Sequence, residues 1–504
     1  MRRVGRLSLG VDVSASLNLV ATLIKYLGVT VAFPTAIALG YSEPFWPFLV
    51  AGAVAIGFGA GLERITSGAE RVGVREGFLV ISLTWLLAAT FGALPYVLSG
   101  DDQLGRPVDA FFEAMSGFTT TGSTVVTAFD DLPRSLLMWR QFTQWLGGMG
   151  IIVLALAILP RLRVGGRQLL EAELPGPEVD QLAARIRDIA RRLWILYVAL
   201  TVSEALVLAI VGWSGIDSKM SLFDAVGHAL TTIPTGGFTT VSGSIGAFGA
   251  VSQWVIGLFM LAAATNYALA YRALVRRQPG ALARDDEFHF YLGLLVLAGV
   301  VLTLELWTEG IATGEAAIRH SAFQAVSIMT TTGYASANFA GWTALATMVL
   351  IGLMFVGGSA GSPSGSIKVV RHLLLGRILR RELHQTLHPE LVVPVRLNGR
   401  VVDERTLRAI EVFILLYVGV FVAGAGLLAM DAARTGLELG VIDAVAAAAS
   451  TLGNVGPALG FAGPMGSFEP FSDLSKLVLV GLMWLGRLEV IPIVLLFTRA
   501  YWRV

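Results

Sequence analysis

Four short segments, each too short to span a lipid bilayer, recur between longer apolar runs. The first, residues 112–122 (FEAMSGFTTTG), and the third, residues 323–333 (FQAVSIMTTTG), match at identical spacing, whereas residues 223–236 and 442–456 are looser and slightly longer. Non-helical backbone is tolerated at membrane depth only where it is buried in protein or lines a water-filled path. The pattern therefore predicts four re-entrant loops around one axis, each ending in a glycine.

The composition indicates that the chain is a membrane protein. Of its 504 residues, 55% are apolar and only 14% are charged, and the mean hydropathy is +0.71. This composition, with repeated long apolar runs, is typical of a polytopic membrane protein. The lack of cysteine excludes disulfides and thiolate metal sites. No Walker sequence, HExxH motif or plausible catalytic triad indicates an enzyme.

We predict about ten membrane spans from the apolar runs. They cover roughly residues 17–40, 44–62, 75–98, 138–160, 192–213, 253–275, 289–308, 342–372, 408–430 and 474–499. The expected fold is all-α, with two leading transmembrane helices in residues 1–70 and then four membrane–pore loop–membrane repeats with pseudo-fourfold symmetry. The repeats are expected at residues 71–165, 166–284, 285–390 and 391–504. Residues 166–192 and 372–407 are expected to form surface helices.

The distribution of charge orients these spans. Alternate loops hold most of the arginines and lysines, with a dense group between residues 368 and 408, whereas the opposite loops hold acids such as Asp101, Asp109, Asp217 and Glu469. Because basic loops stay in the cytoplasm, we expect both termini there and all four short loops outside. The outer acids have two interpretations, simple solvation of the loops or a negative mouth that concentrates cations.

Each short segment has the parts of a cation filter. A half-helix of about ten residues, ~15 Å long, would direct the negative end of its dipole at the ribbon that follows. Glycine permits the positive φ values that such a ribbon requires, and backbone carbonyls can replace the hydration shell of a monovalent ion. The competing interpretation is a set of polar turns that cap the outer ends of helices. We align the four ribbons on Thr120, Thr121 and Gly122; Pro234, Thr235 and Gly236; Thr331, Thr332 and Gly333; and Asn454, Val455 and Gly456.

Several motifs resemble one family of transporters. Residues 140–150 (RQFTQWLGGMG), continuing to 157–160 (AILP), resemble its first inner helix; residues 231–239 (TTIPTGGFT) resemble its second filter and residues 454–457 (NVGP) its fourth. Over nearly its whole length the chain resembles the TrkH/TrkG-type membrane subunits of bacterial Trk potassium uptake systems, in the superfamily that includes KtrB and fungal Trk. The two extra N-terminal spans favour the TrkH branch. The departures are Pro234 before the second filter threonine, and Leu452 and Gly453 before Asn454.

The resemblance implies a function and partners. Potassium would bind in the filter and enter across the bacterial cytoplasmic (inner) membrane. The subunit would be a homodimer in the lipid bilayer and would bind a cytoplasmic TrkA-type nucleotide-binding regulatory subunit. Neither an organic cofactor in this chain nor a nucleic-acid partner is expected.

A stretch dense in glycine and serine interrupts the predicted span 342–372. It comprises Gly357, Gly358, Ser359, Ala360, Gly361, Ser362, Pro363, Ser364, Gly365 and Ser366. Such a composition cannot continue a helix. It leaves a kink, a cytosolic turn or an intramembrane loop that closes the pore beneath the filter, and the resemblance implies the last. A serine-nucleophile interpretation of residues 358–361 lacks a histidine on a neighbouring membrane helix.

Arg487 lies in the middle of the last predicted span, where an unpaired charge is costly. Glu489 is two residues away and points elsewhere on a helix, so it is not the expected partner. The guanidinium is either satisfied by carbonyls between helices or placed near the pore; the resemblance implies a position below the filter, close to the intramembrane loop. The remaining polar residues of the spans are interpreted as packed or interfacial: Lys25, Glu204, His228, Asn266 and Glu305.

Three transport mechanisms can be compared with these sequence features. Four ribbons that enter from the same side favour a gated, channel-like potassium permease. An H⁺- or Na⁺-coupled symporter would need a titratable or second-ion site, for which the sequence shows no clear carboxylate. A solute transporter with inverted repeats would alternate the topology of its repeats, which these four do not. We therefore expect potassium uptake, gated by the loop at residues 357–366 and by Arg487.

Overall fold

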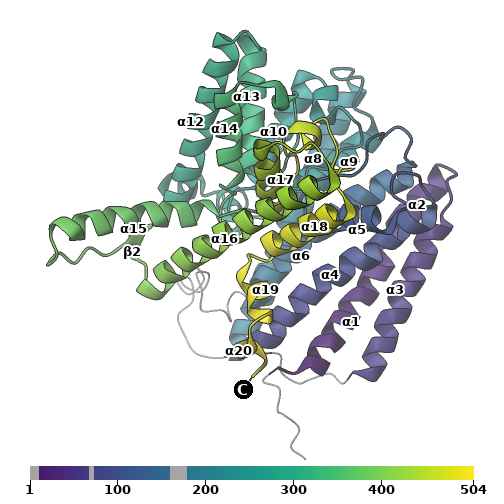
Figure 1. Ribbon diagram of the computed structural model, residues 1–504, viewed down its shortest axis with the longest axis horizontal. Helices are drawn as coiled ribbons and strands as arrows, with labels where there is room; N and C mark the ends of the chain where they lie inside the picture. Colours follow the sequence, from purple (N-terminus) through teal and green to yellow (C-terminus); the bar gives the residue numbers. More distant parts are fainter. Residues whose placement is uncertain (1–10, 67–72, 159–178, 504) are drawn as a thin grey trace, which may run out of the picture.

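The computed structural model describes residues 11–66, 73–158 and 179–503, and this part of the chain is almost entirely helical. It begins with α1 (Val13–Thr30), α2 (Ala32–Gly40) and α3 (Trp46–Ile65), and α1 packs against both α3 and α4 (Figure 1). Asp12 begins α1 because its side chain accepts a hydrogen bond from the amide of Ala15. These helices form the two leading spans.

Four groups of helices follow, each with a long first helix, a short helix and an inner helix. The first group is α4 (Val74–Ser99), α5 (Pro107–Phe118) and α6 (Arg134–Ile158). The second is α8 (Val179–Trp213), α9 (Leu222–Thr232), α10 (Ala250–Ala263) and α11 (Tyr267–Leu274). The third is α12 (Asp286–Thr308), α13 (Gly314–Met329), α14 (Ala344–Met354) and α15 (Val369–Leu387). The fourth is α16 (Glu404–Thr435), α17 (Val441–Gly453), α18 (Asp473–Arg487), α19 (Ile491–Leu496) and α20 (Arg499–Trp502).

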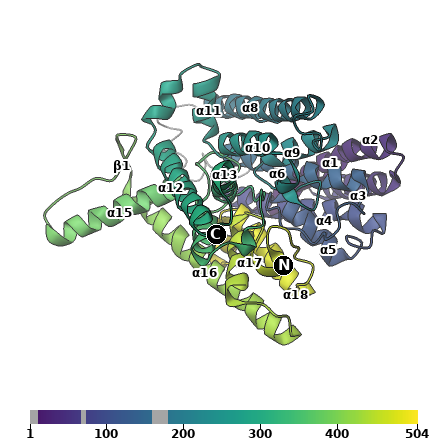
Figure 2. The same ribbon diagram turned by 90° about the horizontal axis from the view of Figure 1, so that it is seen from above.

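The short helices α5, α9, α13 and α17 lie around the middle of the molecule when it is seen from above (Figure 2). Short 3-10 turns follow three of them at η1 (Ser244–Ala247), η3 (Phe339–Gly341) and η4 (Gly460–Ala462), and η2 (Pro279–Arg284) precedes α12. A two-stranded hairpin, β1 (Arg396–Leu397) and β2 (Arg400–Val401), follows α15, which projects from the body. The predicted all-α fold, with two leading spans and four membrane–pore loop–membrane repeats, is confirmed.

Six helical segments among the described residues are long and apolar enough to span a bilayer, and a seventh is added if the bent pair α10–α11 counts as one span. The six are α1 with α2, α3, α4, the part of α8 from Ala190, α12 and α16. Every one of them precedes or opens a repeat. The protein is therefore a multi-pass membrane protein whose inner helices differ in kind from its outer ones.

The inner helices of the last three repeats are broken. The break in the third repeat was predicted from the glycine–serine stretch, whereas the prediction of continuous spans at residues 253–275 and 474–499 is wrong. The axis bends by 108° between α10 and α11, where Asn266 caps the second helix by accepting from the amides of Ala268 and Leu269. In the third repeat no helix exists between Met354 and Val369. The last span stops at Arg487 because the two residues before α19, Glu489 and Val490, have φ of 58° and 57°. The break in the third repeat has the strongest sequence signal, a run dense in glycine and serine; single residues, Asn266 and Pro492, accompany the other two.

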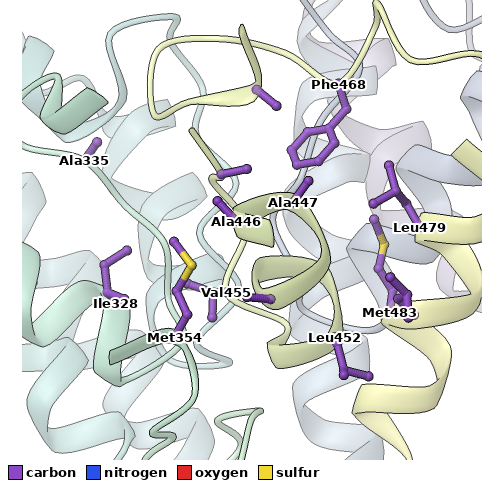
Figure 3. Close-up of a cluster of buried hydrophobic side chains, with 14 of the residues drawn as sticks. Ile328, Ala335, Met354, Ala446, Ala447, Leu452, Val455, Phe468, Leu479 and Met483 are labelled. Carbon is purple, nitrogen blue, oxygen red and sulfur yellow. The ribbon is translucent and has the colours of Figure 1, made fainter. Parts of the chain in front are cut away.

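The apolar core surrounds α17. Its alanines, including Ala446 and Ala447, are fully buried, and Leu452 continues this face toward the end of the helix. Figure 3 shows Met354 of α14 and Met483 of α18 on opposite sides of this helix. Small side chains on a pore helix allow the neighbouring backbones to approach closely.

Candidate ion filter and intramembrane loop

The four short helices end in the same backbone pattern. In each, one amide bonds back three residues: Thr120 to Gly117, Thr235 to Thr232, Thr331 to Ile328 and Asn454 to Thr451. The next amide bonds back five residues, at 2.8 to 2.9 Å: Thr121 to Ser116, Gly236 to Thr231, Thr332 to Ser327 and Val455 to Ser450. The first residue of each pair has a positive φ, at 52°, 57°, 58° and 53° in chain order. The four ribbons that follow the helices therefore share one register.

The predicted alignment of the second ribbon is wrong by one residue. Thr235, rather than Pro234, is equivalent to Thr120, and Gly236 is equivalent to Thr121. The equivalent glycines, two residues beyond the positive-φ residue, are Gly122, Gly237, Gly333 and Gly456, with φ of 87°, 79°, 79° and 112°. The second ribbon reads Thr-Gly-Gly, so its first Thr-Gly pair resembles the end of the other ribbons although it lies one residue earlier.

These glycines bring each ribbon against the next. A Cβ atom on Gly122 would lie 2.2 Å from the carbonyl oxygen of Gly236, and one on Gly237 would lie 1.8 Å from that of Thr332. The series continues from Gly333 to the oxygen of Val455 at 1.9 Å, and from Gly456 to the oxygen of Thr121 at 2.8 Å. The fourth ribbon thus meets the first and closes a ring. Positive φ and lack of space both require glycine at this level.

Side-chain hydrogen bonds join the ribbons of different repeats. The amide of Gln144 on α6 donates to the carbonyl oxygen of Gly236 at 2.7 Å, and Asn454 donates to the hydroxyl of Thr121 at 2.9 Å. Ser123 donates to the carbonyl oxygen of Gly456 at 2.7 Å. Each of these bonds joins two different repeats, so the position of one ribbon depends on its neighbours.

A cavity of about 270 Å³ opens on the side of the ring away from the short helices' ends. All four glycines of the ring line it, together with residues 461–470. Its lining in the described part of the chain holds one carboxylate, Glu469, and one guanidinium, Arg140. Asp109 and Asp217, interpreted above as outer acids, are buried instead: Asp109 pairs with Lys476 at 2.6 Å, and Asp217 accepts from Ser252 at 2.6 Å. Neither is solvated, because each has buried donors.

A second buried ion pair lies behind the first ribbon. Arg140 Nε and Glu113 Oε1 are 2.7 Å apart, and neither side chain is exposed. Glu113 also accepts from the amide of Val125 at 3.0 Å, and Arg140 donates to the carbonyl oxygen of Thr239 at 3.2 Å. Val125 and Thr239 follow the first and second ribbons, so the ion pair fixes the backbone just after both of these ribbons.

The sequence did not predict that Glu113 and Arg140 hold the chain after the ribbons, or that Lys476 pairs with Asp109. One signal for the role of Glu113 was available. In the first three short segments, the acid or amide near the start of the segment binds the chain that follows the ribbon, as Glu113 does with Val125. Asp224 accepts from the hydroxyl of Thr240 at 2.6 Å, and Gln324 donates to the carbonyl oxygen of Tyr334 at 3.3 Å. The recurrence of this position in the repeats indicated a shared contact.

The glycine–serine stretch forms a largely buried loop next to the ribbons, rather than a simple kink. The amide of Gly365 donates to the hydroxyl of Thr331 at 2.7 Å, and a Cβ atom on Gly365 would lie 2.4 Å from the carbonyl oxygen of Gly453. Ser359 N donates to the oxygen of Ala264, at the break between α10 and α11, at 2.9 Å. Neighbouring helices thus satisfy non-helical backbone inside the protein, as membrane depth requires. Most of its members are buried: Gly357, Gly358, Ser359, Ser362, Pro363, Ser364, Gly365 and Ser366.

Charged side chains surround this loop. Arg487 is 2% exposed and donates to the carbonyl oxygens of Pro363 at 2.6 Å and Gly147 at 3.3 Å. Glu287, in the first turn of α12, accepts from the amide of Ala360 at 2.6 Å. Glu489 pairs with Arg371 instead of Arg487. The loop therefore contacts α12 and the end of α18, and Arg487 joins it to α6.

Of the five other polar residues singled out in the predicted spans, four have structural partners. Lys25 pairs with Glu63, Glu305 accepts from the hydroxyl of Thr343 at 2.6 Å, and Nδ1 of His228 lies 2.7 Å from the carbonyl oxygen of Asp224. Asn266 caps α11. Glu204 is fully buried, and neither of its carboxyl oxygens forms a hydrogen bond among the described residues.

Comparison with known proteins supports one family. Residues 47–503 match the TrkH family model, described as cation transport protein. The Trk system potassium uptake protein TrkH of Escherichia coli K12 is 40% identical over 432 residues, 85% of this chain and 86% of that protein. TrkH of Halomonas elongata is 37% identical over 493 residues, 97% and 98% of the two chains.

A solved structure agrees with these matches. The crystal structure of the potassium transporter TrkH from Vibrio parahaemolyticus superposes with a TM-score of 0.86 at 34% identity, covering 97% of this chain and 99% of the other. These relatives are named as transport proteins rather than as enzymes. The chain belongs to the TrkH family of cation transport proteins.

Proposed function

We propose that this protein takes up potassium across the bacterial cytoplasmic membrane through the ring of four ribbons. The observation that carries the proposal is the common register of the ribbons, whose glycines at positions 122, 237, 333 and 456 close one ring. Backbone oxygens at the ends of four short helices suit a monovalent cation, because they replace its hydration shell without binding it too tightly. The TrkH proteins of Escherichia coli and Halomonas elongata are named as potassium uptake proteins, which supports this choice of ion.

Each repeat contributes one ribbon in this proposal, with boundaries at residues 71–165, 166–284, 285–390 and 391–504. Val11 packs in one cluster with Tyr501, so the first described residues and the last helix lie at the same end of the molecule. In this proposal that end lies in the cytoplasm, because basic loops favour the cytoplasmic side. Potassium binds at the level of Thr120, Thr235, Thr331 and Asn454 and at the two levels above it. The transported ion is the only ligand that the proposal requires of this chain.

The loop at residues 357–366 and Arg487 form the gate in this proposal. The loop contacts Thr331 of the third ribbon and is bound from the other side by Arg487. A guanidinium near the ion path repels cations by about 4 kcal/mol at 4 Å with an effective dielectric near 20. In this proposal, release of the loop moves both its backbone and the guanidinium of Arg487 away from the ion path. A homodimer and a TrkA-type nucleotide-binding subunit acting on this loop are part of the same proposal.

Reconstitution tests the function directly. Purified protein in liposomes should take up Rb⁺ and K⁺ down their gradients and exclude Na⁺. Uptake should persist without a proton or sodium gradient if the protein works as a gated permease, and should require one if it is an H⁺- or Na⁺-coupled symporter. Equal fluxes of K⁺ and Na⁺ in well-folded protein would refute the proposed function.

A further inference from the structure

Lys368 directly follows the glycine–serine loop and stands at the N-cap position of α15. Lysine is rare in this chain, and the cations that follow in α15, such as Arg371 and Arg377, are arginines. A guanidinium is a planar fork, whereas an ammonium is a compact charge with three donors. A lysine at this position therefore suits a small group of oxygen acceptors.

The loop before this lysine is closed at its base. The amide of Gly357 donates to the carbonyl oxygen of Ile367 at 2.9 Å, and the amide of Val369 donates to that of Gly358 at 3.2 Å. These two bonds join the segment that enters the loop to the segment that leaves it. Lys368 lies at this base, between the two residues of the leaving segment.

The side chain of Lys368 reaches from the base to the tip of the loop. Its ammonium donates to the carbonyl oxygen of Ser362 at 3.2 Å, to the carbonyl oxygen of Ser364, and to the hydroxyl of Ser364 at 3.3 Å. The same hydroxyl lies 2.7 Å from that of Ser362 and accepts from the amide of Gly358 at 3.1 Å. Hydrogen bonds from a charged donor are strong, so one side chain fixes the tip relative to the base.

The carbonyls of the tip are bound by two cationic side chains. Lys368 binds those of Ser362 and Ser364, and Arg487 donates to that of Pro363, between them, at 2.6 Å. Backbone carbonyls are also the ligands that replace the hydration shell of potassium. Because these three already face fixed positive charges, the tip repels an approaching cation instead of binding it.

The acids around the loop have other partners. Glu287 accepts from the amide of Ala360 at 2.6 Å, and Glu489 pairs with Arg371. Lys368 is partly buried, and its partners named above are oxygens of the loop rather than a carboxylate. A charge removed from water is stable only where hydrogen bonds replace its hydration. The lysine and the folded loop therefore stabilise each other.

We propose that Lys368 is a positioning residue of the gate, whose ammonium sets the shape in which the loop closes beneath the ribbons. The inference rests on the proposed function of this loop as a gate. With the ammonium in place, the tip keeps Gly365 against the hydroxyl of Thr331. Without it, the carbonyls of the tip lose their donors, and the loop moves away from the third ribbon.

A single thiol reports the shape of the loop independently of flux. The chain contains no cysteine, so Ser359→Cys places one reporter in the loop at a position that is 1% exposed. In detergent, Lys368→Met should increase the rate at which a water-soluble maleimide modifies this thiol several-fold. A second reporter, Ser82→Cys, replaces a buried hydroxyl of α4 that forms no hydrogen bond among the described residues, and its rate should not change. Lys219→Met, which removes an exposed lysine, is the matched control and should leave both rates unchanged.

Rb⁺ flux into liposomes connects this shape to gating. Lys368→Met should raise basal Rb⁺ flux several-fold and leave the Rb⁺/Na⁺ ratio unchanged, because the ring itself is not altered. Lys368→Gln keeps a donor without the charge and should be intermediate in both flux and modification rate. If Lys368→Met is not recovered folded, Lys368→Gln decides the outcome.

The two measurements separate the ways in which the inference can fail. An unchanged rate at the loop thiol, with selective flux in the wild type, would overturn the role of Lys368 and leave the filter proposal intact. Faster modification of both thiols would show that the lysine stabilises the whole protein, and faster modification of the loop thiol without a rise in flux would overturn its role in gating. Absence of selective Rb⁺ flux in the wild type would refute the filter proposal instead, and the modification rates would still decide whether Lys368 shapes the loop.

Discussion

Arg487 donates a hydrogen bond to the backbone oxygen of Pro363, and this contact joins the broken end of the last inner helix to the loop beneath the ribbons. Arg487 is the last residue of α18, so its guanidinium reaches the loop from a helix terminus. A charged donor to a carbonyl is a strong hydrogen bond. In the proposed gate, the arginine holds the loop closed and adds a positive charge below the ring.

Arg487→Gln should increase K⁺ flux per molecule, because it removes this charge and weakens the hold on the loop. A charge at 4 Å accounts for about 4 kcal/mol at an effective dielectric near 20, so the increase should be large. The measurement is Rb⁺ flux normalised to folded protein recovered in detergent. Arg434→Gln removes an exposed arginine paired with Asp431 and serves as control. Less folded protein with unchanged flux per molecule would assign Arg487 a structural role.

Shortening the loop by several of residues 357–366 should raise basal flux and leave the K⁺/Na⁺ ratio unchanged. The deletion removes backbone below the ribbons but leaves the ring of glycines in place. Combined with Arg487→Gln it should be non-additive, since both changes release the same element. A well-folded deletion variant with reduced flux would indicate that the loop supports the helices instead of closing a path.

Gly237→Ala should reduce K⁺ over Na⁺ discrimination more than Gly236→Ala. A Cβ on Gly237 would meet the backbone oxygen of Thr332 at a positive φ, where an L-residue also costs about 1 kcal/mol. A Cβ on Gly236 would meet the side chain of Gln144, which can move. Flux ratios of Rb⁺ to Na⁺ measure the difference, with Gly299→Ala in open space as control. A larger effect at Gly236 would contradict the register described here.

The buried pair of Glu113 and Arg140 should be a major determinant of stability. Arg140→Gln leaves an unpaired buried charge and should cost about 3 to 5 kcal/mol. Adding Glu113→Gln should restore part of this loss, because the remaining charge is then removed. Thermal unfolding in detergent measures both, and Asp473→Asn, which breaks the exposed pair with Arg106, should cost less than about 1 kcal/mol. Equal losses for Arg140→Gln and Asp473→Asn would contradict the prediction.

The sequence predicted the parts of the fold that depend on local pattern. Repeated spacing located the short helices and the ribbons at residues 120–122 and 331–333, and glycine–serine density located the loop. It did not predict the breaks beside Asn266 and Glu489, because each is marked by a single residue, the cap Asn266 and Pro492 in the first turn of α19, within an otherwise apolar run. The predicted register of the second ribbon was wrong because Thr235-Gly236 matches the Thr-Gly pattern of the other ribbons. The backbone torsion of Gly237 and its contact with the next ribbon show that Gly237 is the equivalent of Gly122.

The interruption of the inner helices has a consequence for how such a protein can be tuned. The ring is built from the backbone pattern that the four repeats share, whereas the loop beneath it belongs to the third repeat. The loop contacts the helix breaks of the second and fourth repeats, at Ala264 and Arg487. With the ring as the proposed filter and the loop as the proposed gate, recognition of the ion and control of its passage are encoded in separable residues. Changes confined to residues 357–366 or to the end of α18 can adjust the rate of opening over a wide range while the choice of ion stays the same.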